Sequence, residues 1–277
     1  MAKSHFFCNF VGLNDSDWTM RLRQWLMMGA ALMGMAAAAS EHADTITMMT
    51  LNLHAGHDAS LEEIGALIKQ YQPDFVALQE VDHRTQRANC PHQNGRDFVT
   101  ELAHHSGMQG LFGPTIAFAG GRYGIGLLTR HEYVEVRNIK LPHPNDRMEQ
   151  RGLLEATCVL PGGDTLIVAC THLEAFDSLS RVAQAEYIAR HYADAPHPVV
   201  LSGDLNAPPT DPVIAGLTRQ WLDCTGDTPT FSVERPNTKI DYVLARPRAL
   251  WRTLWWQVLP VKVSDHHPVV ARIALSR

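Results

Sequence analysis

Polar residues that could do chemistry recur at or just after short apolar runs of this 277-residue chain. An apolar run that ends in a polar residue is how a strand delivers a side chain to the rim of a sheet, and α/β proteins commonly build their sites at such rims. Oxygen ligands for a divalent cation, two imidazoles and amide donors make an inventory suited to hydrolysis of a phosphate ester. The motifs are Thr50-Leu51-Asn52-Leu53, Leu78-Gln79-Glu80-Val81, Thr171-His172-Leu173, Ser202-Gly203-Asp204-Leu205-Asn206 and Ser264-Asp265-His266-His267-Pro268.

In this order, the motifs resemble those of the endonuclease/exonuclease/phosphatase superfamily, which includes apurinic endonucleases, pancreatic-type deoxyribonucleases, bacterial sphingomyelinases and inositol-polyphosphate phosphatases. The resemblance runs from about Ile46 to Leu275, and Lys239-Ile240-Asp241-Tyr242 adds to it. Each motif alone is unspecific, but the whole set in register is hard to produce by chance. The resemblance implies an α/β four-layer sandwich, in which two mixed β-sheets pack face to face with helices on the outer faces.

The resemblance also implies a divalent cation, Mg²⁺ with Mn²⁺ or Ca²⁺ as alternatives, held by Glu80, Asn52 and Asp265. Glu80 ends an otherwise apolar predicted strand, where a carboxylate is costly to bury unless it is paired or binds a cation. A salt bridge to Arg84 or Arg87 is the structural alternative for Glu80. Asn52 carries an amide where an aliphatic residue would pack more easily, and by resemblance it holds the metal-binding glutamate or the phosphate.

Asp204 can orient or deprotonate the attacking water, and Asn206 would project to the same side of an extended chain. The neighbours Asp265 and His266 point in different directions, so Asp241 is the better partner for His266. An acceptor on one imidazole nitrogen fixes the tautomer and makes the other nitrogen more basic. The sequence leaves open whether Asp204 or His266 is the general base. By resemblance, the full catalytic set is Tyr123, His172, Asp204, Asn206, Asp241 and His266.

Four residues are expected near the phosphate. Tyr123 matches a family tyrosine that touches the phosphate, and His172 can donate to a phosphoryl oxygen or satisfy a backbone carbonyl. Arg151 resembles an arginine of many bacterial members that could clamp a second anionic group. A surface salt bridge with Glu149 is the alternative for Arg151. Arg84 is the second residue predicted to bind substrate.

Two other groups of residues are given structural interpretations. His54 and His57 could be zinc ligands when read alone, but they are expected to line the pocket or face solvent. Trp251, Trp255 and Trp256 invite comparison with the membrane-docking residues of sphingomyelinases, but packing on an edge strand is favoured.

Strands and helices alternate along the chain, which predicts one α/β domain that positions these residues. Helices are predicted at residues 61–71, 97–105 and 178–192. Strands are predicted at residues 46–53, 74–78, 111–118, 124–129, 133–139, 152–160, 165–170, 199–201, 240–244, 251–258 and 269–273.

The N-terminal segment reads as a targeting signal that precedes a catalytic domain at residues 44–277. Met20-Arg21-Leu22-Arg23 forms a basic region, residues 25–39 are apolar, and Ala37-Ala38-Ala39 offers a cleavage site before Ser40. This predicts a signal peptide at residues 20–40 and a periplasmic or secreted protein, although a buried helix is the alternative. Residues 1–19 do not fit a signal and are interpreted as a start-site artefact or a disordered extension.

Charge and cysteine content bound the function further. The formal net charge is −5, and removal of residues 1–40 changes it to −6 and leaves four lysines. Proteins that track a nucleic-acid backbone usually carry a basic stripe, so long DNA is a weaker substrate prediction. The mature chain keeps Cys90, Cys158, Cys170 and Cys224, which allow three disulfide pairings or remain buried free thiols.

The sequence therefore predicts an exported, divalent-metal-dependent phosphoesterase that hydrolyses a phosphodiester or phosphomonoester by in-line attack of activated water. A small phosphoester or a phospholipid headgroup is the expected substrate, and no obligate protein partner is evident. The alternatives are a nuclease acting on DNA or RNA, a sphingomyelinase-like phospholipid phosphodiesterase, and a non-catalytic binding module on the same fold.

Overall fold

Two six-stranded mixed sheets form the centre of the computed structural model, which describes residues 45–276. The first sheet contains, in spatial order, β11 (Trp251–Val258), β12 (Val269–Leu275), β1 (Thr45–Asn52), β2 (Phe75–His83), β4 (Gly121–Thr129) and β3 (Gln109–Phe118). The second contains β5 (Glu132–Lys140), β6 (Gly152–Val159), β7 (Thr165–His172), β8 (Val199–Asp204), β10 (Asp241–Arg246) and β9 (Leu222–Asp223). The pairs β1–β2 and β7–β8 are parallel, and the other neighbouring strands are antiparallel.

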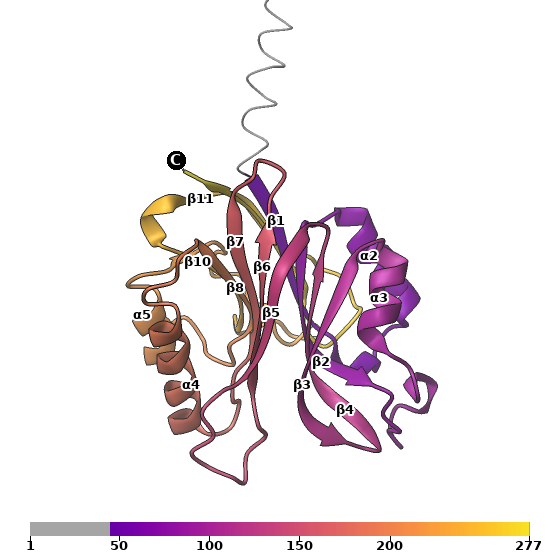
Figure 1. Ribbon diagram of the computed structural model, residues 1–277. Helices are drawn as coiled ribbons and strands as arrows, with labels where there is room; N and C mark the ends of the chain where they lie inside the picture. Colours follow the sequence, from indigo (N-terminus) through magenta and orange to yellow (C-terminus); the bar gives the residue numbers. More distant parts are fainter. Residues whose placement is uncertain (1–44, 277) are drawn as a thin grey trace, which may run out of the picture. The chain divides into compact units, whose positions relative to one another are not determined.

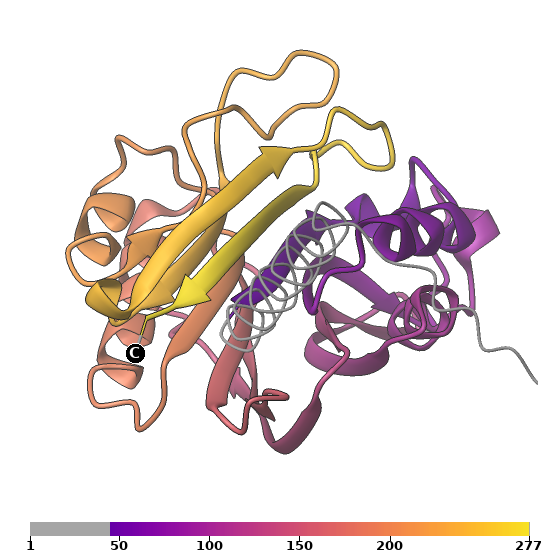
Figure 2. The same ribbon diagram turned by 90° about the horizontal axis from the view of Figure 1, so that it is seen from above.

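The two sheets face each other across a hydrophobic core to which both contribute. Met48 and Phe75 of the first sheet share one buried cluster with Val168 and Val243 of the second. Helices α2 (Leu61–Tyr71) and α3 (Phe98–Ser106) cover the outer face of the first sheet, and α4 (Ser178–His191) and α5 (Pro212–Leu217) cover the second (Figure 1). Figure 2 shows the early helices, in purple, and the late helices, in orange, on opposite sides of the sheets. This arrangement confirms the predicted four-layer sandwich.

The helices begin where polar side chains satisfy their free backbone N–H groups. Ser60 and Glu63 form a reciprocal capping box at the start of α2. Asp97 and Asp177 accept from backbone N–H groups at the starts of α3 and α4. The predicted helices match α2, α3 and α4 to within one residue at each end. The short helix α5 was not predicted, because its six residues give too little periodic signal.

The prediction that Glu80 ends its strand is wrong. β2 continues to His83, and the pairing register with β4 shifts between Leu78 and Val81. Glu80 lies at this irregularity with a φ of +55°. A β-bulge of this kind re-aims a side chain without ending the strand, so Glu80 reaches the site from within β2.

The four cysteines of the described chain are buried and free, which confirms the thiol interpretation. Cys158 pairs with Leu166 across the β6–β7 hairpin and not with Cys170.

The expectation that the tryptophans pack on an edge strand holds for two of the three residues. Edge strand β11 buries Trp251 and packs Trp256 against the core, while Trp255 is exposed.

The predicted signal peptide and the segment before it lie outside the described residues. Within residues 45–276, none of the helices has the length and hydropathy needed to span a membrane.

Candidate active site

Three neighbouring strand ends of the second sheet bring three predicted catalytic residues into one row. His172 is the last residue of β7, Asp204 is the last of β8 and Asp241 is the first of β10. The strand register pairs Asp204 with both of the others. Gly203 has a φ of +151°, and a Cβ there would lie 2.0 Å from the carbonyl oxygen of Thr171. Glycine therefore permits the close approach of β8 to β7 next to the site.

Asn52, at the end of β1, joins the two sheets at this point. Its Nδ2 donates to Glu80 Oε1 at 3.1 Å and to Asp204 Oδ2 at 3.2 Å. Its Oδ1 accepts from the backbone N–H of His54 at 3.0 Å. An amide nitrogen cannot bind a cation. Because the Asn52 nitrogen is the atom that faces Glu80 and Asp204, Asn52 orients these two carboxylates and does not offer a metal ligand beside them.

Asp204 is buried at the centre of the constellation. Its Oδ2 lies 3.5 Å from His172 Nε2 and 3.7 Å from His266 Nε2. Burial, followed by the negative charge of Asp241, raises the pKa of Asp204 to about 7. A carboxylate with a pKa near neutrality is suited to taking a proton from water.

His266 has the partner that the sequence predicted. Its Nδ1 lies 2.9 Å from Asp241 Oδ2, and both residues are buried. Burial alone lowers the pKa of His266, but the charges and hydrogen bond of Asp241, followed by the charge of Asp204, outweigh it and raise the pKa to about 10. His266 is therefore an imidazolium at neutral pH, with a second nitrogen directed at Asp204.

Asn206 does not follow the predicted geometry. Its φ is +47°, so the chain turns after Asp204 and is not extended. The Asn206 backbone N–H donates to Asp204 Oδ1 at 2.8 Å, and its side-chain Nδ2 donates to the carbonyl of Leu173 at 3.0 Å. Asp204 and Asn206 were expected to project to the same side only if the chain were extended, and the turn at Asn206 means that this condition is not met. Asn206 instead braces the loop that carries Asp204.

Arg151 contacts protein groups and is 7% exposed, so its salt bridge with Glu149 is not the surface pair considered from the sequence. Its Nη1 lies 3.0 Å from Glu149 Oε1 and 3.2 Å from His172 Nδ1, and its Nε lies 3.4 Å from Glu174 Oε2. Burial, followed by the charges of Arg151 and His266, lowers the pKa of His172 well below its ordinary value. His172 is therefore neutral, in contrast to His266.

Tyr123 lies near the site, whereas the Arg84 side chain forms no hydrogen bond or ion pair with it in the described chain. Tyr123 lines one small depression with Glu149, Arg151 and His172, and burial, followed by the charge of Glu80, raises its pKa well above the ordinary value.

Neither of the two arginines considered as partners of Glu80 forms an ion pair with it in the described chain. Arg84 is exposed, and no contact in the described chain links its side chain to the other predicted residues. Arg87 lies over the Tyr123 ring and pairs with Asp82 at 2.5 and 3.0 Å. Within the described residues, neither arginine forms the salt bridge that was the alternative for Glu80.

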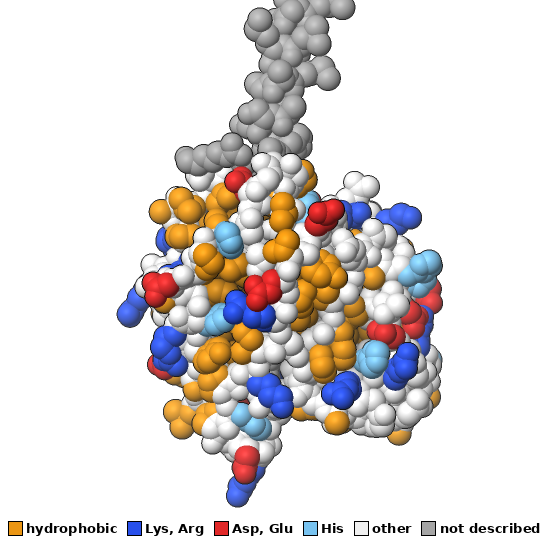
Figure 3. Space-filling model, viewed as in Figure 1, with side chains coloured by type: hydrophobic (Ala, Val, Ile, Leu, Met, Phe, Trp, Pro, Cys, Tyr) orange, Lys and Arg blue, Asp and Glu red, His pale blue; other side chains and the backbone are white. Residues whose placement is uncertain are grey.

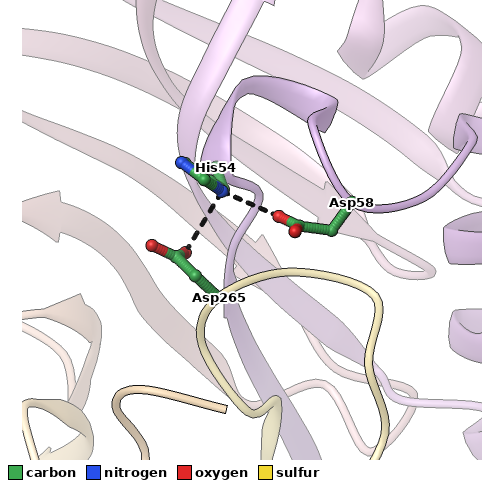
Figure 4. A group of neighbouring side chains, drawn as sticks. All are labelled: His54, Asp58 and Asp265. Carbon is green, nitrogen blue, oxygen red and sulfur yellow. Dashed lines mark hydrogen bonds and ion pairs between the residues drawn. The ribbon is translucent and has the colours of Figure 1, made fainter. Parts of the chain in front are cut away.

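Asp265, the third predicted metal ligand, lies in a group with His54 and Asp58 (Figure 4). His54 Nδ1 is 2.7 Å from Asp58 Oδ2 and 3.8 Å from Asp265 Oδ1. The ligand atoms of all three lie within 4.8 Å of one another. Glu80 is outside this group, but the Asn52 amide connects the two places, because it bonds both to Glu80 and to the His54 backbone.

The types of donor at these two places fit a divalent cation. Glu80 presents a partly buried carboxylate whose hydrogen-bond partner is the Asn52 amide. Asp58 and Asp265 add two carboxylates beside one imidazole, that of His54. Carboxylate oxygens suit Mg²⁺, Ca²⁺ and Mn²⁺, whereas a tetrahedral zinc site usually takes more sulfur or nitrogen ligands.

Sequence reasoning missed two residues of this neighbourhood. Asp58 is four residues after His54, and Glu174 is two residues after His172. Glu174 directly follows the motif Thr171-His172-Leu173, so an acidic residue at that strand end was a usable signal. The position of Asp58 beside His54 depends on the turn at His54 and Ala55, which both have positive φ. No residue pattern in the sequence predicts this turn.

Comparisons with known proteins agree with the fold and the order of the motifs. A family model described as Endonuclease/Exonuclease/phosphatase family matches residues 49–266. A search of curated proteins finds no match.

Solved structures include several similar proteins. An endonuclease/exonuclease/phosphatase from Beutenbergia cavernae has a TM-score of 0.72 and 24% identity, over 84% of this chain and 72% of that one. A mannosyl-6-phosphatase from Bacteroides thetaiotaomicron has a TM-score of 0.64 and 15% identity, over 83% of this chain and 100% of that one. The catalytic domain of human Nocturnin, solved with bound sulfate, has a TM-score of 0.64 and 22% identity, over 84% and 94%. At these identities the likeness shows the fold.

Proposed function

The chain belongs to the endonuclease/exonuclease/phosphatase family, and on that premise we propose that it is a divalent-metal-dependent phosphoesterase that cleaves a small phosphodiester or phosphomonoester. Members of this family are generally metal-dependent hydrolases. The observation that carries the proposal is the buried Asp204, which faces one neutral imidazole and one imidazolium and accepts a hydrogen bond from the Asn52 amide that also bonds Glu80. A binding module would gain nothing from a buried carboxylate whose pKa is raised toward neutrality.

In the proposed reaction, Asp204 takes a proton from water, and the water oxygen attacks phosphorus in line with the leaving oxygen. His266 supplies a positive charge and an N–H group beside the phosphoryl oxygens, where negative charge grows in the transition state. Asp241 keeps His266 charged and oriented through its 2.9 Å contact. His172 directs its Nε2 toward Asp204 at 3.5 Å, and Tyr123 lies beside His172 in one small depression.

A cation would be held by Glu80 and by Asp265, with His54 and Asp58 as the further donors. When bound, a divalent cation neutralises charge on the phosphoryl group and on the leaving oxygen. A panel of nucleic acids, phospholipids, inositol phosphates and sugar phosphates, assayed with the metal-stripped protein, tests the proposal. Turnover of at least one phosphoester that returns only with added Mg²⁺ or Mn²⁺ is expected, and no turnover of any member with either metal contradicts it.

Activity is expected to rise with pH. The pKa of Asp204 is raised to about 7, so its basic form is lost as the pH falls through that value. The plot of kcat/KM against pH should therefore climb between about pH 6 and pH 8, as expected for a general base. A profile that is flat over this interval would remove Asp204 as the base.

We further propose that the substrate is small and not a long polyanion. On the face shown in Figure 3, Lys and Arg side chains are scattered among acidic ones without a continuous basic area. The formal net charge of −5 does not favour capture of DNA.

Plasmid DNA is therefore expected to be a poorer substrate than a small phosphodiester. The test compares kcat/KM for the two substrates at about 50 mM and about 200 mM salt, the range over which multiple phosphate contacts weaken strongly. The expected result is a higher value for the small phosphodiester at both salt concentrations. Efficient plasmid cleavage that falls steeply with salt would favour the nuclease alternative.

Export remains our proposal for localisation, with a periplasmic or secreted mature protein. Expressed in a Gram-negative host from Met20, the chain should be recovered from the periplasm with a new N-terminus at or near Ser40. Intact mass and N-terminal sequencing check this. A full-length product in the cytosol would contradict it.

A further inference from the structure

His172 and His266 each direct Nε2 at the Asp204 carboxylate, but their Nδ1 atoms contact groups of opposite charge. Nε2 of His172 lies 3.5 Å from Asp204 Oδ2, and Nε2 of His266 lies 3.7 Å from the same oxygen. Behind His266, the Asp241 carboxylate contacts Nδ1 at 2.9 Å. Behind His172, the Arg151 guanidinium contacts Nδ1 at 3.2 Å. The first arrangement favours a protonated Nδ1, and the second forbids one.

The chemistry of the guanidinium decides the tautomer of His172. An arginine side chain has N–H donors and no acceptor, so the Nδ1 of His172 must accept the hydrogen bond from Arg151. The ring proton of neutral His172 is then on Nε2, the nitrogen directed at Asp204 and the proposed reaction site. A neutral imidazole in this tautomer donates one N–H there and has no free basic nitrogen at that end.

Arg151 is held in place by two carboxylates. Glu174 contacts its Nε at 3.4 Å, and Glu149 contacts its Nη1 at 3.0 Å. Glu174 is 1% exposed and is itself fixed, because its Oε1 accepts from the backbone N–H of Phe176 and its own N–H donates to Gln184. These contacts use Nε and, counting the bond to His172, both hydrogens of Nη1.

We propose that Arg151 is a positioning residue, held by Glu174, that fixes His172 as a neutral Nε2–H donor facing the reacting group. The proposal rests on the proposed function and replaces the earlier expectation that Arg151 clamps the substrate. It gives the two histidines different tasks. Asp241 offers an acceptor to Nδ1 of His266, while Arg151 offers a donor to Nδ1 of His172, so the ring proton of His172 is directed at Asp204.

The tautomer can be measured without any substrate. In protein labelled with ¹⁵N in the histidine rings, long-range ¹H–¹⁵N spectra distinguish an unprotonated ring nitrogen from a protonated one. The His172 signals are identified as those lost in a His172→Gln spectrum. We expect wild-type His172 to show an unprotonated Nδ1 and a protonated Nε2 at neutral pH. A protonated Nδ1 in the wild type overturns the proposal, even if every variant fails to fold.

A double variant tests whether Arg151 is the cause. Arg151→Met combined with Glu174→Gln removes the guanidinium without leaving the Glu174 carboxylate buried and unpaired. We expect His172 to lose the single-tautomer signature, and kcat to fall on the order of 10- to 100-fold, the scale for partners that orient a functional imidazole, with KM nearly unchanged. Arg190→Gln, on the exposed side of α4, serves as the matched control and should change neither property.

A substrate clamp predicts a different pattern. Loss of a clamp that binds ground state and transition state alike raises KM and leaves kcat and the His172 tautomer as they were. That result in the folded double variant would overturn the positioning role. Absence of all phosphoesterase activity together with the expected tautomer shift would contradict the proposed function and leave the Arg151–His172 arrangement supported, so the two failures are distinguishable.

Discussion

Replacement of Asp204 by asparagine is expected to lower kcat by about 10³-fold, within the range that a positioned general base contributes. Asparagine keeps the size of the side chain but cannot take a proton from water. Its oxygen can still accept from the backbone N–H of Asn206, which in the wild type donates to Asp204 Oδ1 at 2.8 Å. Activity should therefore be lost while the fold is retained, as measured by kcat and by thermal unfolding.

The matched control for this variant is Asp194→Asn, which makes the same chemical change at an exposed position. The control should keep the wild-type kcat. Removal of the buried Asp204 charge also ends the repulsion with Asp241, so the variant is not expected to unfold at a lower temperature. A variant at position 204 with more than about a tenth of the wild-type kcat would show that the water is activated by another group.

Replacement of Glu80 by glutamine is expected to lower kcat by at least about 10²-fold, the scale for loss of a key electrostatic stabiliser. Glutamine is nearly isosteric, but it substitutes a neutral amide for the charged carboxylate of the proposed cation site. The Asn52 amide, which donates to Glu80 Oε1 at 3.1 Å, can donate to the glutamine oxygen instead. The bulge in β2 should therefore persist, and the loss should come from weaker cation binding.

The measurement is a titration of activity with Mg²⁺ for wild type, the variant at position 80 and the exposed control Glu132→Gln. A raised Mg²⁺ requirement together with a lower maximum is expected for the variant at position 80 alone. Near-normal activity at saturating Mg²⁺ would remove Glu80 from the cation site.

Much of this site is predictable from the sequence, because its polar residues stand at the ends of buried apolar runs that form strands. His172, Asp204 and Asp241 each border a buried run, and parallel or paired strands bring such borders to one rim. The His266–Asp241 pair follows from the same logic, because adjacent residues cannot face each other and a neighbouring strand must supply the partner.

Features that depend on long-range pairing were not predictable. The bulge at Glu80 arises from the register of β2 against β4, and the turn at Asn206 arises from a positive φ. The buried position of Arg151 depends on Glu174 and His172, which lie 23 and 21 residues away in sequence. The resemblance to an arginine of many bacterial members suggested a substrate clamp, because an arginine suits bidentate contact with an anion.

The central claim is that Asp204 directs water to attack phosphorus in a cation-dependent reaction. It is tested most directly by hydrolysis of a small aryl phosphodiester in ¹⁸O-labelled water, with metal-stripped wild-type protein to which Mg²⁺ or Mn²⁺ is added back. The account predicts one labelled oxygen on the phosphoryl product, none on the released alcohol, and no turnover without the added cation. Label on the alcohol, or equal turnover by the wild type and Asp204→Asn, would contradict it.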